Sequence, residues 1–492
     1  MNKRFLLIAA CLVLLISGRT FSQTSNVAYF MKLPQSHFLN PAFKPVNRFY
    51  IGLPVISGIN IGLENNFISL SDIFVPGLKA DSIFTFQNPD FSLSALASKL
   101  NKKNTIATDA SIQIFGLALP VGKNFTLMID ITDRFSGKIL FPRELLDLYL
   151  TGGSDIIGTP INISEMNVKA QFYREYAAGV SGDIIPNLRV GARVKILSGI
   201  GSLSLDNRAF SLTVNNDLSQ TVSADATMET AGRGTLNTIF NNSSSKALDP
   251  VKGYLTAPFR NPGFALDAGA TYSFGRLITV SAAVKDLGFI KWKDGLNSWN
   301  ANSTFSLPGI TLQDVQNQSF SVDEMFGKLV DSVKANFRQV NSPSAFTTKL
   351  PGQFILGASF NPFKFLSLGV LSVSKAWAGS MNENITLSAN TYLGRTFAAT
   401  LAYTIANDSY NNIGFGLAFK AGVAQIYMIA DKIPVQWNKV YFPKSGGGYS
   451  GIPMPENFNK LSFQVGMNIV FGKQVAPKND KPAVQTTGTE KK

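Results

Sequence analysis

Apolar and polar residues alternate along most of the chain, in segments of roughly ten residues. Residues 412–420 are typical, because Ile413, Phe415, Leu417 and Phe419 alternate with small or polar residues. Successive side chains of a β-strand point to opposite faces, so each such segment predicts a strand with one apolar and one polar face. The other clear examples are 264–274, 397–405 and 462–471.

Repeated strands of this kind predict a membrane β-barrel. A soluble β-sandwich also alternates, but the face opposite the apolar one carries mainly Gly, Ala, Ser, Thr and Asn, where a solvated face would carry Lys and Glu. The links between strands are often short, and no apolar stretch after residue 22 is as long as a transmembrane helix. We therefore predict an all-β chain that forms a single antiparallel transmembrane β-barrel of about 14 strands. The candidate strands are 49–54, 58–64, 110–119, 124–133, 169–181, 188–204, 207–217, 264–275, 277–290, 353–360, 364–374, 384–393, 396–406, 412–420, 423–431 and 461–471, of which some are expected to be loops or plug.

Two of the longer insertions between these strands carry helix patterns. In 321–337, Ser321 and Glu324 form a capping box and the apolar residues fall on one face. In 142–150, Pro142 suits the first turn of a short helix. We expect both helices to pack at the mouth of the barrel, and the alternative is a helix that docks a partner protein.

The two ends of the chain differ from the barrel. Residues 1–22 place two basic residues before a short apolar run, which is the pattern of a cleaved secretory signal peptide. The alternative is a lipoprotein signal that ends before Cys11. Export followed by barrel formation predicts the cell outer membrane as the location. The remaining divisions are an N-terminal plug or lead-in segment at 23–47, the barrel at 48–472 and a disordered tail at 473–492.

Composition excludes several functions. The only cysteine, Cys11, lies inside the predicted signal, which excludes a disulfide scaffold, a cysteine-ligated zinc site and a cysteine nucleophile. The only histidine, His37, precedes the first strand, where we expect a loop or plug residue rather than a catalytic base. The formal net charge is +14, but Lys and Arg are scattered, which favours attraction to anionic lipid headgroups over nucleic-acid binding. We predict no enzymatic activity, no metal and no cofactor.

Charged residues on the inward faces of the strands are the candidate site. If the aromatic faces meet lipid, Arg189, Arg193 and Lys195 share the lumen side of one strand. Arg174 and Glu175 are consecutive, so only one of them can face the lumen. One reading is a polar constriction that selects a solute, and the other is a set of paired charges that braces the barrel. The remaining candidates are Arg134, Asp267 and Asp286, with Lys285 beside Asp286.

Several phrases of the chain resemble a known family. They are FLNPAF at 38–43, YIGLP at 50–54, GINIGLEN at 58–65, REY at 174–176, NLRVGARVKILSG at 187–199, GFALDAGATY at 263–272, VKDLGFIKW at 284–292, NIGFGLAFKAGVAQIYMIADKIP at 412–434 and VGMNIVFG at 465–472. Together they resemble domain of unknown function 5723, an uncharacterised outer-membrane family of Bacteroidota. That family is similar to long-chain fatty-acid-transporter-like and type IX-secretion-associated outer-membrane barrels. The resemblance covers about 40–472 and implies fold and compartment far more than activity.

Three functions are compatible with these features. The first is a non-enzymatic outer-membrane barrel that binds or passes a small hydrophobic solute, as the resemblance implies. The second is an outer-membrane anchor or adaptor for a surface or secretion complex, with helix 321–337 and the tail after Phe471 as its contact regions. The third is a soluble secreted β-rich binding protein, which would keep its apolar faces inside.

Overall fold

The computed structural model describes residues 26–31, 33–44, 47, 49–67, 75–76, 83–84, 98–122, 124–144, 157–216, 219–232, 259–307, 338–394, 396–406, 409–435, 437–443, 448–455 and 460–472. Two short helical elements lie near its beginning, α2 (Val27–Phe30) and the 3₁₀ helix η1 (Pro34–Phe38). The predicted helix at 321–337 and most of the one at 142–150 lie outside the described residues. Pro142 itself ends a strand.

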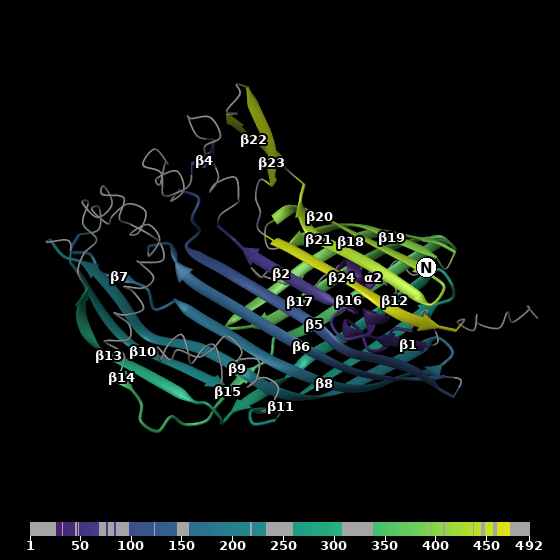
Figure 1. The fold of residues 1–492 in the computed structure, drawn as a ribbon, viewed down its shortest axis with the longest axis horizontal. Helices are drawn as coiled ribbons and strands as arrows, with labels where there is room; N and C mark the ends of the chain where they lie inside the picture. The colour runs from purple at the N-terminus through teal and green to yellow at the C-terminus, as the bar shows by residue number, and fades with distance from the viewer. Residues whose placement is uncertain are drawn as a thin grey trace, which may run out of the picture.

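Fourteen strand positions close into an antiparallel barrel (Figure 1). One of these positions is occupied by two short strands, β1 (Phe49–Gly52) and β2 (Ile59–Asn65). Each of them pairs with β24 (Lys460–Phe471) on one side and with β5 (Lys103–Val121) on the other. The all-β barrel and its strand number are thus confirmed. The barrel strands are β1 (Phe49–Gly52), β2 (Ile59–Asn65), β5 (Lys103–Val121), β6 (Phe125–Pro142), β8 (Asn167–Ile185), β9 (Leu188–Val214), β11 (Pro262–Phe274), β12 (Ile278–Trp292), β16 (Gly352–Phe363), β17 (Leu366–Trp377), β18 (Ser380–Leu393), β19 (Phe397–Ala406), β20 (Ser409–Ala421), β21 (Ala424–Pro434) and β24 (Lys460–Phe471).

The apolar faces of these strands point outward. Leu387 and Leu401 are 52% and 61% exposed, whereas their neighbours Ser388 and Ala402 are buried inside. A soluble monomer rarely exposes so continuous an apolar surface, but a barrel in lipid requires one. The soluble alternative, which needs these faces inside, does not fit. Exposed apolar side chains on the other strands include Ile112, Ile129, Val180, Ile196, Leu266, Leu287, Phe354, Leu368, Phe415, Ile426 and Phe463.

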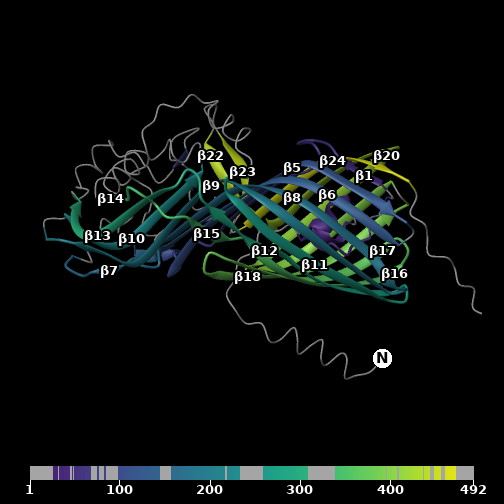
Figure 2. The same ribbon diagram turned by 90° about the horizontal axis from the view of Figure 1, so that it is seen from below.

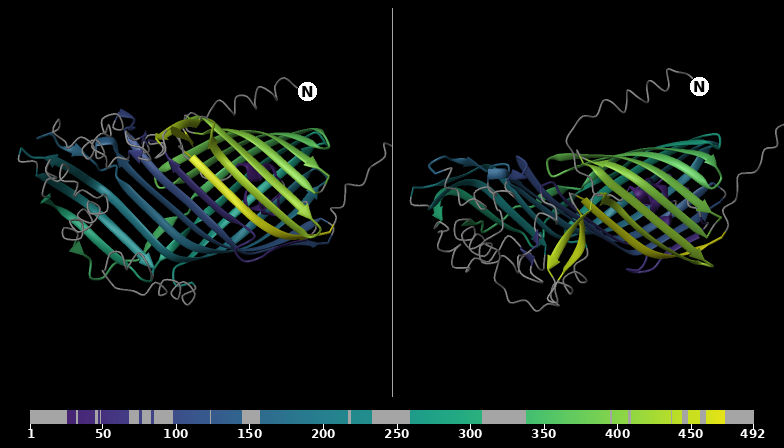
Figure 3. Two further views of the ribbon diagram at one scale, coloured as in Figure 1. Left: turned by 45° about the horizontal axis from the view of Figure 1, so that its top comes forward. Right: turned by 90° about the horizontal axis from the view of Figure 1, so that it is seen from above.

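The two ends of the barrel are unlike. At one end six hairpins turn within two or three residues, at 122–124, 186–187, 275–277, 364–365, 394–396 and 422–423. Longer stretches separate β6 from β8, β9 from β11, β12 from β16 and β21 from β24, and the strands within these stretches lie at the other end (Figure 3). We call the two ends the short-turn end and the long-loop end.

At the long-loop end the sheet continues beyond the barrel. β9 is longer than expected, because it combines the separately predicted strands 188–204 and 207–217. Its second half pairs with β10 (Gln220–Gly232), and β10 pairs with β13 (Asn297–Leu307). Neither was predicted as a strand, because small and polar residues dominate both. The other short strands are β3 (Val75–Pro76), β4 (Ile83–Phe84), β7 (Ile161–Asn162), β14 (Arg338–Gln339), β15 (Phe346–Lys349) and the hairpin β22 (Trp437–Pro443) and β23 (Tyr449–Pro455).

The wall is interrupted once between β1 and β2. Residues 53–58 leave the regular ladder but stay bonded to it, since Val55 N donates to the Gln113 carbonyl oxygen (3.1 Å) and Met467 N donates to that of Ile56 (2.7 Å). Val55 has a positive φ of 65° and, like Ile56, is 47% exposed. This segment, called the wall break below, therefore presents apolar side chains outward at an irregular point of the barrel.

Candidate functional site: the plugged lumen

The chain fills its own lumen with its first described residues. α2 and η1 lie inside the barrel (Figure 2), in the half that ends in short turns. Val27 and Asn40 are completely buried, and Phe30 and Met31 nearly so. We call residues 26–44, without the undescribed residue 32, the plug.

One side of the plug is held by apolar packing. Val27, Phe30 and Leu39 belong to a buried apolar cluster that also contains inward side chains of the barrel wall. These wall residues are Ala283, Ile355, Leu371, Val373, Ala402, Ala418, Tyr427 and Ile429, on strands β12 to β21. Apolar side chains from these strands therefore line the lumen under the plug, among polar ones, although the lumen of an open porin is polar.

Hydrogen bonds hold the start and the middle of the plug. The backbone N–H of Asn26 donates to Asp431 Oδ2 (2.6 Å), and the side-chain Nδ2 of Asn26 donates to Thr386 Oγ1 (2.7 Å). Gln35 and Asn468 exchange two hydrogen bonds, of 2.6 and 3.0 Å. Buried amides lose hydration on folding, so these partners fix the plug in one position.

His37 connects the plug to the opposite, charged side of the wall. Its Nδ1 lies 2.5 Å from the Pro34 carbonyl oxygen and its Nε2 lies 2.8 Å from Asp130 Oδ2. Both partners are acceptors, so both ring nitrogens donate only if the ring is the imidazolium. The ring thus links the Pro34 carbonyl group of the plug to the Asp130 carboxylate of β6.

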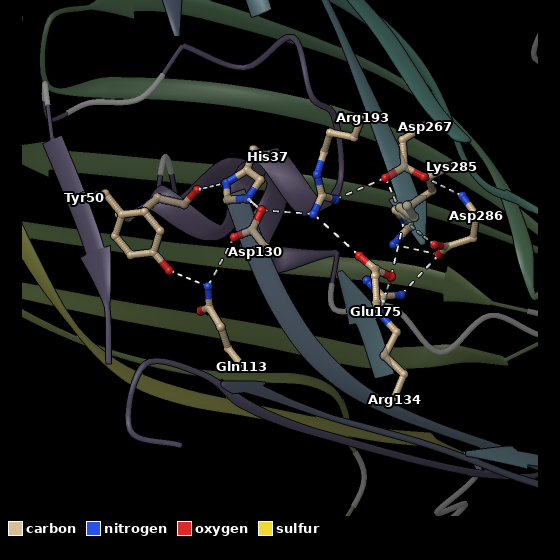
Figure 4. Close-up of polar contacts among 12 residues, drawn as sticks. His37, Tyr50, Gln113, Asp130, Arg134, Glu175, Arg193, Asp267, Lys285 and Asp286 are labelled. Carbon is tan, nitrogen blue, oxygen red and sulfur yellow. Dashed lines mark hydrogen bonds and ion pairs between the residues drawn. The ribbon is translucent and has the colours of Figure 1, made fainter. Parts of the chain in front are cut away.

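Asp130 belongs to a buried cluster of charges (Figure 4). Arg193 donates to Asp130 Oδ2 (3.0 Å) and to Asp267 Oδ2 (3.1 Å), and it lies 3.5 Å from Glu175. Lys195 lies 2.7 Å from Asp267 Oδ2 and 3.5 Å from Glu175. Unpaired charge is costly in a low-dielectric interior, and here each carboxylate has at least two cationic partners.

A β-bulge adds two consecutive charges to this cluster. Leu266 pairs with Leu287 but Ala268 pairs with Val284, so two residues of β12 lie opposite Asp267. They are Lys285 and Asp286, and Asp286 has a positive φ of 57°, which aspartate tolerates better than most residues. The bulge thus buries both side chains in the lumen, where a regular strand would place only one of them.

Ion pairs also cross the lumen. Asp286 lies 2.5 Å from Lys195 and 3.2 Å from Arg134 of β6. Lys375 of β17 lies 2.5 Å from Asp109 of β5, and equal numbers of strands separate β5 from β17 in either direction around the barrel. These contacts connect opposite walls and divide the lumen beside the plug.

A cavity of about 120 Å³ remains between the plug and these ion pairs. The plug contributes Gln35, Phe38 and Leu39 to its lining, and Gly58 contributes from the edge of the wall break. The charged side chains around it are Asp109, Arg134, Lys285, Asp286 and Lys375. It holds a few water molecules or one small solute.

The structure brings five of the six candidate residues together. Arg134, Arg193, Lys195, Asp267 and Asp286 are all in the charged cluster. Arg189 lies apart, near the short-turn end, where it donates to Ser181 Oγ (2.8 Å) and Thr126 Oγ1 (3.0 Å).

Sequence reasoning missed Asp130 and its contact with His37. Asp130 shares the inward face of β6 with Thr132 and Arg134, so strand parity could have found it. Glu175 faces the lumen, and Arg174 pairs with Asp133 of the neighbouring strand on the outer face (2.7 Å). The inward pairing of His37 depends on how the plug folds, which no periodicity reveals.

Neither metal ligation nor a membrane helix is found in the described part of the chain. Its His, Cys, Asp and Glu residues form no group of three or more that could hold a metal ion. None of its helices has the length and hydrophobicity that crossing a membrane requires.

Fold and lumen together define a class, a closed fourteen-stranded barrel blocked by its own N-terminal segment. Residues 41–431 match the family described as "Family of unknown function (DUF5723)", and the chain belongs to that family. No curated protein sequence matches it.

Three solved structures are similar to the chain at low identity. A FadL homologue of Pseudomonas aeruginosa is 10% identical with a TM-score of 0.44, and the alignment covers 92% of this chain and 100% of that one. The toluene transporter TbuX of Ralstonia pickettii is 10% identical with a TM-score of 0.39, covering 93% and 96%. The toluene transporter TodX of P. putida is 8% identical with a TM-score of 0.38, covering 92% and 97%.

Proposed function

We propose that this protein is a non-enzymatic outer-membrane barrel that binds or passes a small hydrophobic solute when its plug moves. The observation that carries the proposal is the group of apolar lumen side chains that packs with α2, which includes Ile355, Leu371 and Val373. A displaced plug would expose this surface, and a hydrophobic solute would replace the contacts that the plug gives up. The outward apolar band supports the membrane location.

The plug is suited to move as a unit. Its hydrogen bonds to the wall come mainly from Asn26, Tyr29, Gln35, His37 and Asn40, and its apolar contacts are non-directional. The ion pairs across the lumen join wall residues to each other. Among the described residues, the basic side chains of the plug contact wall carboxylates at two places, His37 with Asp130 and Lys44 with Asp183.

The wall break offers a lateral route for the solute. Gly58 lies at the edge of both the break and the cavity, and Val55 and Ile56 face outward beside it. A hydrophobic solute that leaves through this point would enter lipid without crossing water, and exit through the short-turn end is the other route.

A disulfide that fixes the plug tests the proposal. A Cβ built at Gly414 of β20 lies 2.8 Å from Val27 Cγ2, close to the separation across a disulfide between a Cβ and the far sulfur. With Cys11 in the predicted signal, the pair Val27→Cys and Gly414→Cys would introduce the only thiols of the exported chain.

Uptake of a radiolabelled small aromatic hydrocarbon would be measured in Gram-negative cells that express this variant. We expect uptake to fall at least tenfold under oxidising conditions and to recover after reduction. The single variant Val27→Cys is the control and should respond to neither treatment. Equal uptake by oxidised and reduced cells would contradict the proposal.

A second candidate function is an anchor or adaptor for a surface or secretion complex. The hairpin of β22 and β23 favours it, because this hairpin projects beyond the barrel at the long-loop end (Figure 1). Replacing residues 437–455 by a short turn would abolish partner capture and leave hydrocarbon uptake intact if the adaptor role is correct. The other contact regions considered, 321–337 and the tail, lie outside the described residues.

A further inference from the structure

The cavity beside the plug contains one ammonium group that is poorly paired. Lys285 is 4% exposed and lines the cavity. Its one ion pair among the described residues is with Asp286 Oδ2, at 3.4 Å. That carboxylate is already shared, because Lys195 lies 2.5 Å from Oδ1 and Arg134 lies 3.2 Å from Oδ2.

The carboxylates around Lys285 are already shared with other cations. They belong to Asp130, Glu175, Asp267 and Asp286, and the other basic side chains of the cluster are Arg134, Arg193 and Lys195. Lys195 contacts three of these carboxylates, whereas among the described residues Lys285 contacts only Asp286. Burying an ammonium group with so few partners is unfavourable unless an anion accompanies it.

A hydroxyl group on the same lining is also without a partner. Thr132 is 4% exposed, and its Oγ1 makes no hydrogen bond to any described residue. It lines the cavity on β6, two residues from Arg134, whose guanidinium is on the same inward face. Buried hydroxyls are rarely left unsatisfied, so this group also points to something bound in the cavity.

We propose that this cavity is a binding site for one small hydrophilic oxyanion, a carboxylate or a phosphate. Its negative charge would lie against the Lys285 ammonium, with Lys285 and Thr132 as the donors. A volume of about 120 Å³ limits the ligand to a few heavy atoms, so the site is separate from the apolar surface that we assign to the hydrophobic solute.

Titration calorimetry on the detergent-solubilised full chain tests this site. Sodium acetate and inorganic phosphate are titrated separately at constant ionic strength. We expect one-to-one saturable binding of at least one of them, and which one binds identifies the oxyanion. Lys285→Met should weaken binding at least tenfold. Lys291→Met is the matched control, because Lys291 is on the same strand but exposed outside the barrel, and it should bind as the native chain does.

Two results would overturn the site. One is the absence of saturable binding by either anion, which would mean that the cavity holds water only. The other is unchanged binding by a Lys285→Met variant that still migrates as a folded barrel on an unboiled gel. If that variant does not fold, Thr132→Val replaces it, with an expected weakening of at least threefold. Hydrocarbon uptake by the disulfide variant is a separate measurement, so either proposal can fail without the other.

Discussion

Arg193 contacts three carboxylates of the charged cluster and one ring of the plug. It lies in the lumen with no exposed surface and reaches carboxylates from β6, β8 and β11, while the Phe38 ring of the plug covers its guanidinium at 5.1 Å. A planar guanidinium can donate to several carboxylates at once, which a lysine ammonium does less well. At the scale of residues, Arg193 thus joins the plug to three strands.

Replacing this arginine should be far more damaging than replacing an exposed one. Arg193→Gln leaves three carboxylates short of a cation, and we expect the free energy of unfolding to fall by about 3–5 kcal/mol. Arg208→Gln is the control, because Arg208 is mostly exposed and its pair with Asp225 contributes at most about 1 kcal/mol. Urea unfolding in detergent micelles measures both, and equal losses would contradict the role of Arg193.

At the scale of elements, the fit of the plug against β9 and the irregularities of β12 and β21 shape the lumen. β9 accommodates the plug because Gly191 has no side chain where the chain passes at Pro41. β12 and β21 each present a charge pair to the lumen through a residue of positive φ, Asp286 and Lys432. Irregularities in two strands therefore place Lys285 with Asp286 and Asp431 with Lys432 in the lumen.

A methyl group at Gly191 should loosen the plug. A Cβ there would collide with the Pro41 carbonyl group, which is backbone and cannot rotate away. In a Val27→Cys background, we expect Gly191→Ala to raise the rate of labelling by a water-soluble maleimide at least tenfold. Gly352→Ala is the control, since its Cβ would come no closer than 3.6 Å to any neighbouring atom, an ordinary van der Waals contact. Slow labelling of both variants would mean that the plug tolerates the collision.

The sequence predicts the strands well and the lumen poorly, for a physical reason. Alternation over 412–420 or 397–405 reflects lipid on one side of each strand, and lipid is a uniform partner. β10 and β13 escaped prediction because their faces hold small and polar residues, which alternate weakly. The partners of His37 and the bulge at Lys285 depend on contacts between residues far apart in the chain, which a local pattern does not contain.

At the scale of the whole molecule, the barrel has three distinct surfaces. The outer band is apolar, the lumen wall combines apolar side chains beside α2 with a charged cluster beside η1, and the sheet extends beyond the barrel at the long-loop end. Closure removes every edge strand within the barrel, so lipid can surround it without unsatisfied backbone groups. Solute movement then requires a change inside the lumen rather than in the wall as a whole.

Heat modifiability in the outer membrane tests this account most directly. The full chain, including its predicted N-terminal signal, would be expressed in a Gram-negative host, and the outer-membrane fraction would be run on SDS gels with and without boiling. A closed barrel with a buried ion-pair cluster should resist SDS, so we expect the unboiled band to migrate differently and to shift on heating. A protein found in the soluble fraction, with one mobility under both conditions, would contradict a membrane barrel and with it the proposed function.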